Sequence, residues 1–345
     1  MDRGSTYDES CPGALRVAFE PAALLTIRLT MTLPSLNFLS FESRKTNSLS
    51  LPMFAVFIAL HPLAAFAVIR YFFPFTWEQQ WSGGLGAVVL TTLACNLVFC
   101  FGEYLFHRYL LHANSISFLG KLSFSHLAHH KLTNIKFPGD RVISAYPIED
   151  EEHDEFATFP PHALLAFMVF LTPFLAVSAF SFPHIPILIG GYLAISIAHF
   201  LYETIHVAHH TPYDTWWKSK IEGPVFGTLW RKLYGFHQAH HANYKCNMNI
   251  AGFYGLPLAD LVLGTYQQPA VLLLDGAPAT KELAAKLTST PNWPISVMDS
   301  ALLKRRKRMV REQEQRAARK AAAQDAAPAN AGRPVVDPAG PAELR

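Results

Sequence analysis

The strongest constraint on the fold is a stretch of 47 consecutive residues, 156–202, that contains no Asp, Glu, Lys or Arg. A second uncharged stretch covers 24 residues, 46–69. A helix needs about 20 apolar residues to cross the hydrocarbon core of a bilayer, so both stretches are long enough. Only 16% of the chain is charged, against about 25% in a typical soluble domain. These features predict an integral membrane protein.

Turn signals divide the apolar stretches into separate spans. Two prolines in the turn Ser181–Pro186 interrupt the longest stretch near its middle. An aromatic cluster at 71–81 follows the first span and is typical of side chains at headgroup level. We therefore expect four membrane-spanning helices, at 51–69, 84–106, 161–181 and 186–206.

The distribution of basic residues predicts the orientation of these spans. The segment 70–83 holds one Lys or Arg and the turn 182–185 holds none. By contrast, 1–50 and 107–160 hold five each, and 207–345 holds eighteen. Because cytoplasmic loops carry the excess of Lys and Arg, both termini and the 107–160 loop are expected on the cytoplasmic side.

Four regions of different composition are predicted. Residues 1–48 form an N-terminal cytoplasmic or interfacial segment, and 49–270 form the membrane-embedded domain that carries the chemistry. Residues 271–323 form an extension with a basic helix, and 324–345 form a disordered tail rich in Ala, Pro and Gly. The basic run of that helix, 304–308, either binds anionic lipid or is a solvated face that fixes topology.

Histidines are concentrated in two windows. Eleven of the 16 histidines fall in 107–130 and 206–241. H-x-x-x-x-H occurs once, from His107 to His112. For a second motif, the triplet H-x-x-H-H, random placement of 16 histidines would give roughly 0.03 copies per chain. That triplet occurs three times, beginning at His126, His206 and His237.

Helical spacing predicts convergence of these side chains. Residues three and four apart share a helix face, so the first histidine of each triplet can meet both of the last two at one metal site. Further back, His199, Glu203, His206 and His210 step by four, three and four, a stripe about 16 Å long. Ionisable residues so close to a membrane are expected to be functional.

The number of histidines favours two metal ions. Imidazole suits iron, zinc, copper or nickel, and one structural zinc needs only four ligands. Two ions of roughly six-coordinate type would use ten imidazoles and leave about two positions for oxygen species. The alternative, a pair of haems with bis-histidine ligation, requires isolated histidines near mid-span, whereas these histidines cluster at the predicted span ends.

The order of the motifs resembles the membrane fatty acid hydroxylase and sterol desaturase superfamily. H-x-x-x-x-H follows a span, and then come H-x-x-H-H, an apolar hairpin, Tyr202-Glu-x-x-His206 with His210, and a last H-x-x-H-H. The similarity covers about 103–266, nearly half of the chain. Its downstream part includes Asn247 or Asn249, Asp260 and Gly264-Thr265-Tyr266.

This resemblance implies a dinuclear, functionally di-iron centre that uses dioxygen and two electrons to hydroxylate or desaturate a lipid C–H bond. Zinc is an alternative occupant in the isolated protein. The ligand set that the resemblance implies is His107, His112, His126, His129, His130, His206, His210, His237, His240 and His241.

Two departures from the family pattern affect the expected site. His209 is additional to the usual H-x-x-x-H spacing, and it either supports the site or replaces His210. A glycine that commonly follows the downstream Asn-aromatic pair is missing from Asn249-Ile-Ala-Gly252. Residues expected to support the ligands are Glu103, Glu203, His209 and Asn247. The two glutamates lie one turn before His107 and His206, where a carboxylate can accept the second imidazole N–H; the alternative is a residue that ends a span at the interface.

The sequence contains no cytochrome haem-binding domain, no dinucleotide-binding glycine fingerprint and no flavin motif. Electrons are therefore expected from an external donor protein of cytochrome or ferredoxin type. The acidic segment 149–155 is a solvated loop or a docking surface for that donor. Trp216, Trp217, Trp230 and Tyr234 are expected to seat an amphipathic helix in the membrane interface, with substrate lining as the alternative. His61, His162 and His184 are assigned structural roles.

Together these observations predict an all-α integral membrane protein with about four transmembrane helices and a cytoplasmic helical cap that holds a histidine-rich dimetal site. Its expected function is the O2-dependent hydroxylation of a fatty acyl chain or another lipid within the bilayer. The alternative enzyme is a lipid or sterol desaturase, and the alternative that is not an enzyme is a histidine-rich metal transporter. A net charge of +3 does not indicate nucleic acid as a partner.

Overall fold

A computed structural model describes residues 51–113, 115, 120–148, 158–159, 162–280, 283 and 287–325, with side chains as far as residue 320. The expectations for 1–48, for the acidic segment 149–155 and for the tail after 325 lie outside these residues. Among the described residues, four helices are long and apolar enough to cross a membrane, which confirms the predicted number of spans. They are α1 (Leu51–Phe72), α3 (Gly84–Leu105, continued to His112 by the π-helix η1, Phe106–His112), α6 (Ala163–Ser181) and α7 (Ile187–His209).

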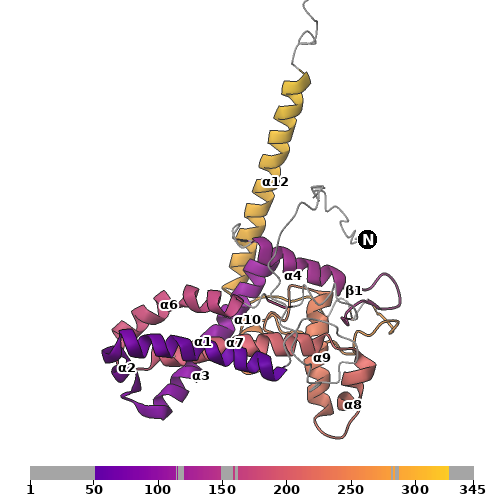
Figure 1. Ribbon diagram of the computed structural model, residues 1–345. Coiled ribbons are helices and arrows are strands. Elements are labelled where there is room, and N and C mark those ends of the chain that lie inside the picture. The colour runs from indigo at the N-terminus through magenta and orange to yellow at the C-terminus, as the bar shows by residue number, and fades with distance from the viewer. Residues whose placement is uncertain are drawn as a thin grey trace, which may run out of the picture.

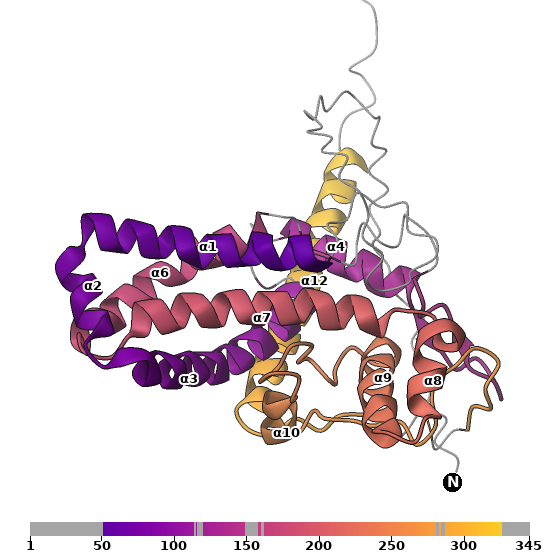
Figure 2. The ribbon, with the colours of Figure 1, turned by 60° about the horizontal axis from the view of Figure 1, so that its bottom comes forward.

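Helix α7 lies among the other three spans (Figure 2). It is the most enclosed span, with 56% of its apolar window buried, whereas the other three windows are 17% to 28% buried. Glycines allow this approach: a Cβ on Gly190 would come within 2.9 Å of Thr91 on α3, and one on Gly191 within 2.6 Å of Leu175 on α6. Small residues at such interfaces are how membrane helices gain packing contacts. The outer spans instead expose large apolar side chains, as lipid contact requires.

The short helix α2 (Pro74–Trp81) closes one end of the bundle. Its buried Gln80 donates hydrogen bonds to the carbonyls of Pro183 and Ile185 and accepts one from the N–H of Leu188. One amide therefore pairs three backbone groups in the turn between α6 and α7. Large aromatic side chains around α2, such as Phe75, are exposed, in agreement with a position at headgroup level.

A cap of short elements lies at the end of the bundle opposite α2 (Figure 2). A two-residue antiparallel pair, β1 with β2, is its only sheet among the described residues. The cap consists of α4 (Gly120–Leu132), β1 (Ile135–Lys136), β2 (Ile143–Ser144), the π-helix η3 (Tyr213–Trp217), α8 (Lys218–Ile221), α9 (Gly227–Ala242) and α10 (Leu258–Leu263).

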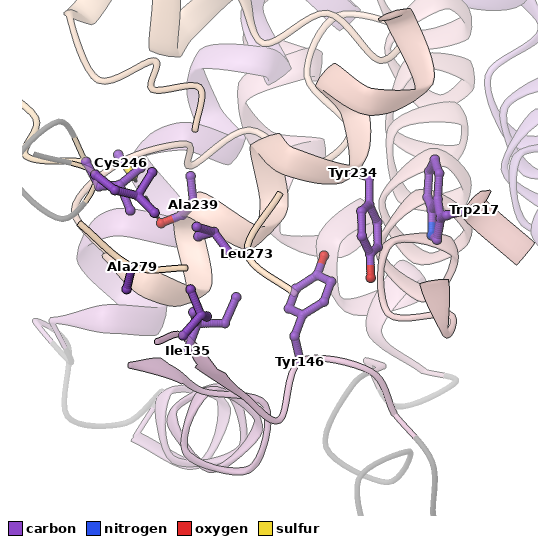
Figure 3. Close-up of a cluster of buried hydrophobic side chains, with 11 residues drawn as sticks. Ile135, Tyr146, Trp217, Tyr234, Ala239, Cys246, Leu273 and Ala279 are labelled. Carbon is purple, nitrogen blue, oxygen red and sulfur yellow. Dashed lines mark hydrogen bonds between the residues drawn. The ribbon is translucent and has the colours of Figure 1, made fainter. Parts of the chain in front are cut away.

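The cap has an apolar core of its own (Figure 3). Tyr146 points toward Tyr234, and the Trp217 ring lies beside the Tyr234 ring, tilted by 34°, with ring centroids 4.9 Å apart. Trp217 and Tyr234 are almost fully buried, so the prediction that they seat a helix in the membrane interface is wrong. The apolar side of α9 is covered by other segments of the cap, and Trp216 and Trp230 are half-buried at the edge of this core.

The last helix, α12 (Ile295–Asp325), leaves the body as a single arm (Figure 1). Its base is anchored: Asp299 accepts hydrogen bonds from the Arg108 guanidinium and from the Tyr109 hydroxyl at 3.0 Å. Ile295 packs in the apolar cluster around Tyr104 at the end of α3. The helix covers the predicted basic stretch and ends two residues beyond the expected 323.

Candidate metal centre

The structure brings all ten predicted ligands together at the cap end of the spans, in two groups of five. Within each group, one nitrogen from every ring lies within 4.8 Å of all the others. The two groups adjoin, because the His130 ring stacks on the His241 ring with centroids 4.2 Å apart. The first histidine group is His107, His112, His126, His130 and His240, and the second histidine group is His129, His206, His210, His237 and His241. These histidines could hold metal, and their role as ligands stays a prediction.

A π-helical turn explains the H-x-x-x-x-H motif. In an α-helix, residues five apart point about 140° away from each other, at about 100° per residue. The segment η1 instead has the i to i+5 hydrogen bonding of a π-helix, a rare feature that is frequent at functional sites. As a result His107 and His112 lie on one face with their rings stacked 5.0 Å apart.

Two of the triplets are divided between the groups. His126 and His130 belong to the first group, whereas His129 between them belongs to the second. In α9 the first and last histidines enter the second group and His240 enters the first. The prediction that all three rings of a triplet meet at one site is therefore wrong. Positions i+3 and i+4 lie on opposite sides of position i on the helix, about 100° apart, so they diverge toward two sites.

The triplet that begins at His206 contributes to one group only. His206 and His210 both enter the second group, as the H-x-x-x-H spacing implies. His209 lies outside the groups, with its ring stacked between those of His237 and Trp217. His199, at the start of the predicted stripe, is also outside the groups and lies 6.0 Å from the Phe167 ring.

Distances between the ring nitrogens suit metal ligands. In the first group the Nε2 atoms form contacts of 2.9 to 3.3 Å. Contacts in the second group are 3.0 to 3.1 Å. An ion about 2.1 Å from each nitrogen would hold neighbouring nitrogens of an octahedron about 3.0 Å apart. The five nitrogens of the first group, and the four of the second group that these contacts join, therefore have the spacing of octahedron corners.

Hydrogen bonds on the other ring nitrogen fix the tautomers. Nδ1–H of His107 donates to the Met248 carbonyl at 2.6 Å, and that of His240 to the Cys246 carbonyl at 2.8 Å. In the second group, His210 donates to the Tyr146 carbonyl at 2.8 Å. Four rings are held in this way, the fourth being His241, whose Nδ1 lies 3.0 Å from the Thr133 hydroxyl.

These tautomers suit a cation between the rings. A neutral imidazole protonated at Nδ1 has only a lone pair at Nε2, so close Nε2 contacts bring lone pairs together. Burial lowers the pKa of His240 to about 4 and lowers the pKa of His126, His129, His237 and His241 well below the usual value. Protons therefore do not relieve the repulsion near neutral pH, and the donor set fits a first-row metal ion.

Glu103 supports the first group through a loop. Its carboxylate accepts the backbone N–H groups of Ile250, Ala251 and Gly252 at 2.5 to 2.9 Å. The prediction that it accepts an imidazole N–H from His107 is wrong, because Met248 already takes that proton. The carboxylate instead holds the segment just after the Met248 carbonyl.

Asp260 and Asn247 complete the support of this loop. The Asp260 carboxylate accepts the N–H groups of Met248 and Asn249 at 2.9 and 2.8 Å, and burial raises its pKa to about 6. The Asn247 amide donates to the Phe236 and Gln267 carbonyls. Asn247 also has φ 56°, a conformation that Asn tolerates well. Asn247 therefore shapes the backbone, because both of these hydrogen bonds go to backbone carbonyls and not to an imidazole.

Other predicted residues lie beside the groups. Glu203 accepts the N–H of Phe159 at 3.1 Å and so fixes the segment before α6. His61 is bonded to the Phe57 carbonyl of its own helix, and His184 contacts the Ser82 hydroxyl at the α2 end. The supporting groups that the sequence did not reveal are mostly backbone carbonyls. Every residue has a backbone carbonyl, so the sequence does not mark these groups. Of the supporting groups that were missed, only the Thr133 hydroxyl belongs to a side chain and could have been recognised from the sequence.

Comparisons with protein-family models, with curated protein sequences and with solved structures give no match to this chain. The resemblance to the hydroxylase superfamily therefore rests on the sequence motifs, and the structure adds two histidine groups that could bind metal.

Proposed function

We propose that the protein is a membrane-bound oxidoreductase that uses O2 to hydroxylate a C–H bond of a lipid. The observation that carries this proposal is the pair of adjacent histidine groups, each with five converging ring nitrogens. A structural zinc site is closed by four ligands. Five ligands to a six-coordinate ion leave one position open, as catalysis requires.

Two ions held there, functionally iron, would supply the activation of O2. The overall reaction is R–H + O2 + 2 electrons + 2 protons giving R–OH + H2O, so an external electron donor is needed. A donor protein of cytochrome or ferredoxin type would reach the cap from the aqueous side. The segments 70–83 and 182–185, at the opposite end of the spans, hold only one Lys or Arg, whereas the segments on the cap side hold the rest. This excess of positive residues supports a cytoplasmic position for the cap.

The residues of the chain prepare the site in three ways. The Cys246 and Met248 carbonyls orient two rings of the first group, so that their Nε2 lone pairs face inward. In the second group every ring is buried, which excludes water. Two rings of the first group, His112 and His130, are only half-buried, so this group faces the side from which small molecules reach the centre.

An apolar groove between α1 and α7 supports a lipid as substrate. It has a volume of ≈ 380 Å3 and is lined on α1 by residues such as Ile58 and Phe66. On α7 its lining ends at Phe200, six residues before His206, a distance of about 9 Å along the helix. The groove opens sideways among the spans and offers almost only carbon, which suits an acyl chain or a flat sterol.

Reconstituted protein tests the proposal directly. Protein loaded with iron in lipid nanodiscs, a chemical reductant and labelled O2 should give a lipid product that carries one labelled oxygen. The His129→Ala variant should abolish this product, and the exposed His184→Ala variant should not. A product with a new double bond and no label would establish a desaturase instead. Movement of metal across a vesicle membrane without lipid modification would establish a transporter.

A further inference from the structure

The direction of α12 relates it to the membrane surface. In both views its axis runs across those of α1, α6 and α7 (Figures 1 and 2). The spans follow the membrane normal, so a helix across them lies along the membrane plane. Its base packs beside Tyr104 and Arg108, near the cap end of the candidate span Gly84–His112. The arm therefore runs at the level of the lipid headgroups on the cap side.

The arm is strongly basic and fully exposed. Every side chain from Leu303 to Lys320 is exposed. The segment 304–320 contains nine Lys or Arg and two Glu, a net charge of +7 along about 24 Å. Apolar Leu303, Met309 and Val310 lie between the basic residues and are 44% to 55% exposed. Basic residues with interspersed apolar ones are typical of helices that lie in a membrane interface.

We infer that α12 binds the anionic lipid headgroups of the membrane that holds the spans. Each Lys or Arg close to an anionic leaflet is attracted to its negative surface potential, and here the spans hold the arm beside that leaflet. A second copy of α12 would bring another net charge of +7 against this one, so charge favours lipid over self-association. The inference is independent of the metal chemistry.

The arm is rigidly placed by its anchor. Arg108 is 7% exposed and donates to both Asp299 oxygens, and it also donates to the Lys245 carbonyl. His107, which precedes Arg108 in the chain, belongs to the first histidine group. Cys246, which follows Lys245, accepts the hydrogen bond from His240 of the same group. The anchor thus joins the lipid-binding arm to the wall of the metal centre.

Limited proteolysis of the full chain in nanodiscs tests the inference. One set of nanodiscs contains phosphatidylcholine alone, and the other also contains phosphatidylserine. Trypsin should cut at Arg316 and Arg319 more than about tenfold more slowly in the anionic discs. The exposed Lys136 and Lys218 in the cap are internal references and should be cut at equal rates in both.

Salt and charge variants separate lipid binding from other protection. Raising the salt from about 0.1 M to about 1 M shortens the screening length from about 10 Å to about 3 Å and should abolish most of the protection. Replacing the five residues 304–308 by Gln should also abolish most of the protection from trypsin. The double variant Glu312→Gln with Glu314→Gln should increase this protection, because it removes two negative charges. Equal cleavage of the arm in neutral and anionic discs, or protection that persists at high salt, would overturn the inference.

Discussion

The first histidine group has half-buried rings on one side, whereas every ring of the second group is buried. Both groups have five nitrogens at similar spacing, so the difference lies in their surroundings. The first group lies against a loop whose carbonyls fix His107 and His240. The second lies between α7 and the aromatic core of the cap, where the Tyr146 ring is 4.6 Å from His210. Equal donor sets can thus serve an accessible ion and an enclosed one.

Neighbouring histidines give the sharpest test of this comparison. His129→Ala should remove the enclosed ion and His130→Ala the accessible one, so each variant should keep about one of two ions. Turnover should fall more than about hundredfold in both, because even supporting residues are worth about 10- to 100-fold. Metal analysis and the rate of chelation measure the difference: the ion left in His130→Ala should be removed more slowly than the ion left in His129→Ala. His209→Ala is the control and should keep both ions.

Acid should destabilise the metal-free protein through both groups at once. The pKa of His240 is lowered to about 4 by burial, and five more ligands outside the spans have pKa values well below the usual 6.5. Because these folded-state values lie below the unfolded value, unfolding takes up protons below about pH 6.5. Stability is therefore complete above that pH and is lost as the pH falls toward 4.

Thermal unfolding of chelator-treated protein between pH 8 and pH 5 measures this loss as a fall in Tm of several degrees. Asp260, with its pKa raised to about 6, acts in the opposite direction and makes this fall smaller. Metal-loaded protein should show a much smaller fall, because ions occupy the Nε2 atoms. A Tm that rises on acidification of the metal-free protein would contradict the burial of neutral rings.

Glu103→Gln should weaken the first group alone. Glutamine offers one oxygen to three backbone donors, and its NH2 would face an N–H group of the turn 250–252. The loop should loosen, and affinity for the accessible ion should fall about 10- to 100-fold. Competition with a chromophoric chelator measures both ions separately. Glu203→Gln, which alters a contact of Phe159, is the matched control and should leave the first group unchanged.

Thr133→Val should have the smallest effect, on the second group alone. It removes the hydroxyl 3.0 Å from Nδ1 of His241 while keeping the shape of the side chain. Affinity for the enclosed ion should fall about tenfold, the low end for a supporting contact, because the packing around the ring persists. Thr133→Ser keeps the hydroxyl and should restore most of the affinity in the same titration. Equal losses in Val and Ser would assign the effect to packing.

The spans were predictable because hydropathy is a local property. The first helix was expected to end at residue 69 and ends at Phe72, and the third was expected from 161 and begins at Ala163. The spacing within the triplets predicted rings that share a helix face, and the resemblance to the hydroxylase superfamily implied the set of ten ligands. Their assignment to two groups required more, since it depends on how α4 and α9 are rotated relative to each other.

The support of the rings was the least predictable part. Glu103 has the right spacing from His107, but its true partners lie 147 to 149 residues later in the chain. The i, i+5 spacing of the first motif was a usable signal for a π-helix, because only that geometry places both rings on one face. Trp217 and Tyr234 were assigned to the interface because their pattern alone does not distinguish lipid from a cap core.

The division of two triplets between the groups has a thermodynamic consequence. Helices α4 and α9 each contribute rings to both groups, so an ion bound in one group orders backbone that the other ion also needs. The second ion then meets rings whose conformational entropy has already been lost, and the two binding equilibria show positive cooperativity. Typical coupling free energies of about 1 to 3 kcal/mol correspond to a change in affinity of about 5- to 150-fold. Partly loaded preparations should therefore be mixtures of empty and fully loaded chains, with few chains that hold a single ion.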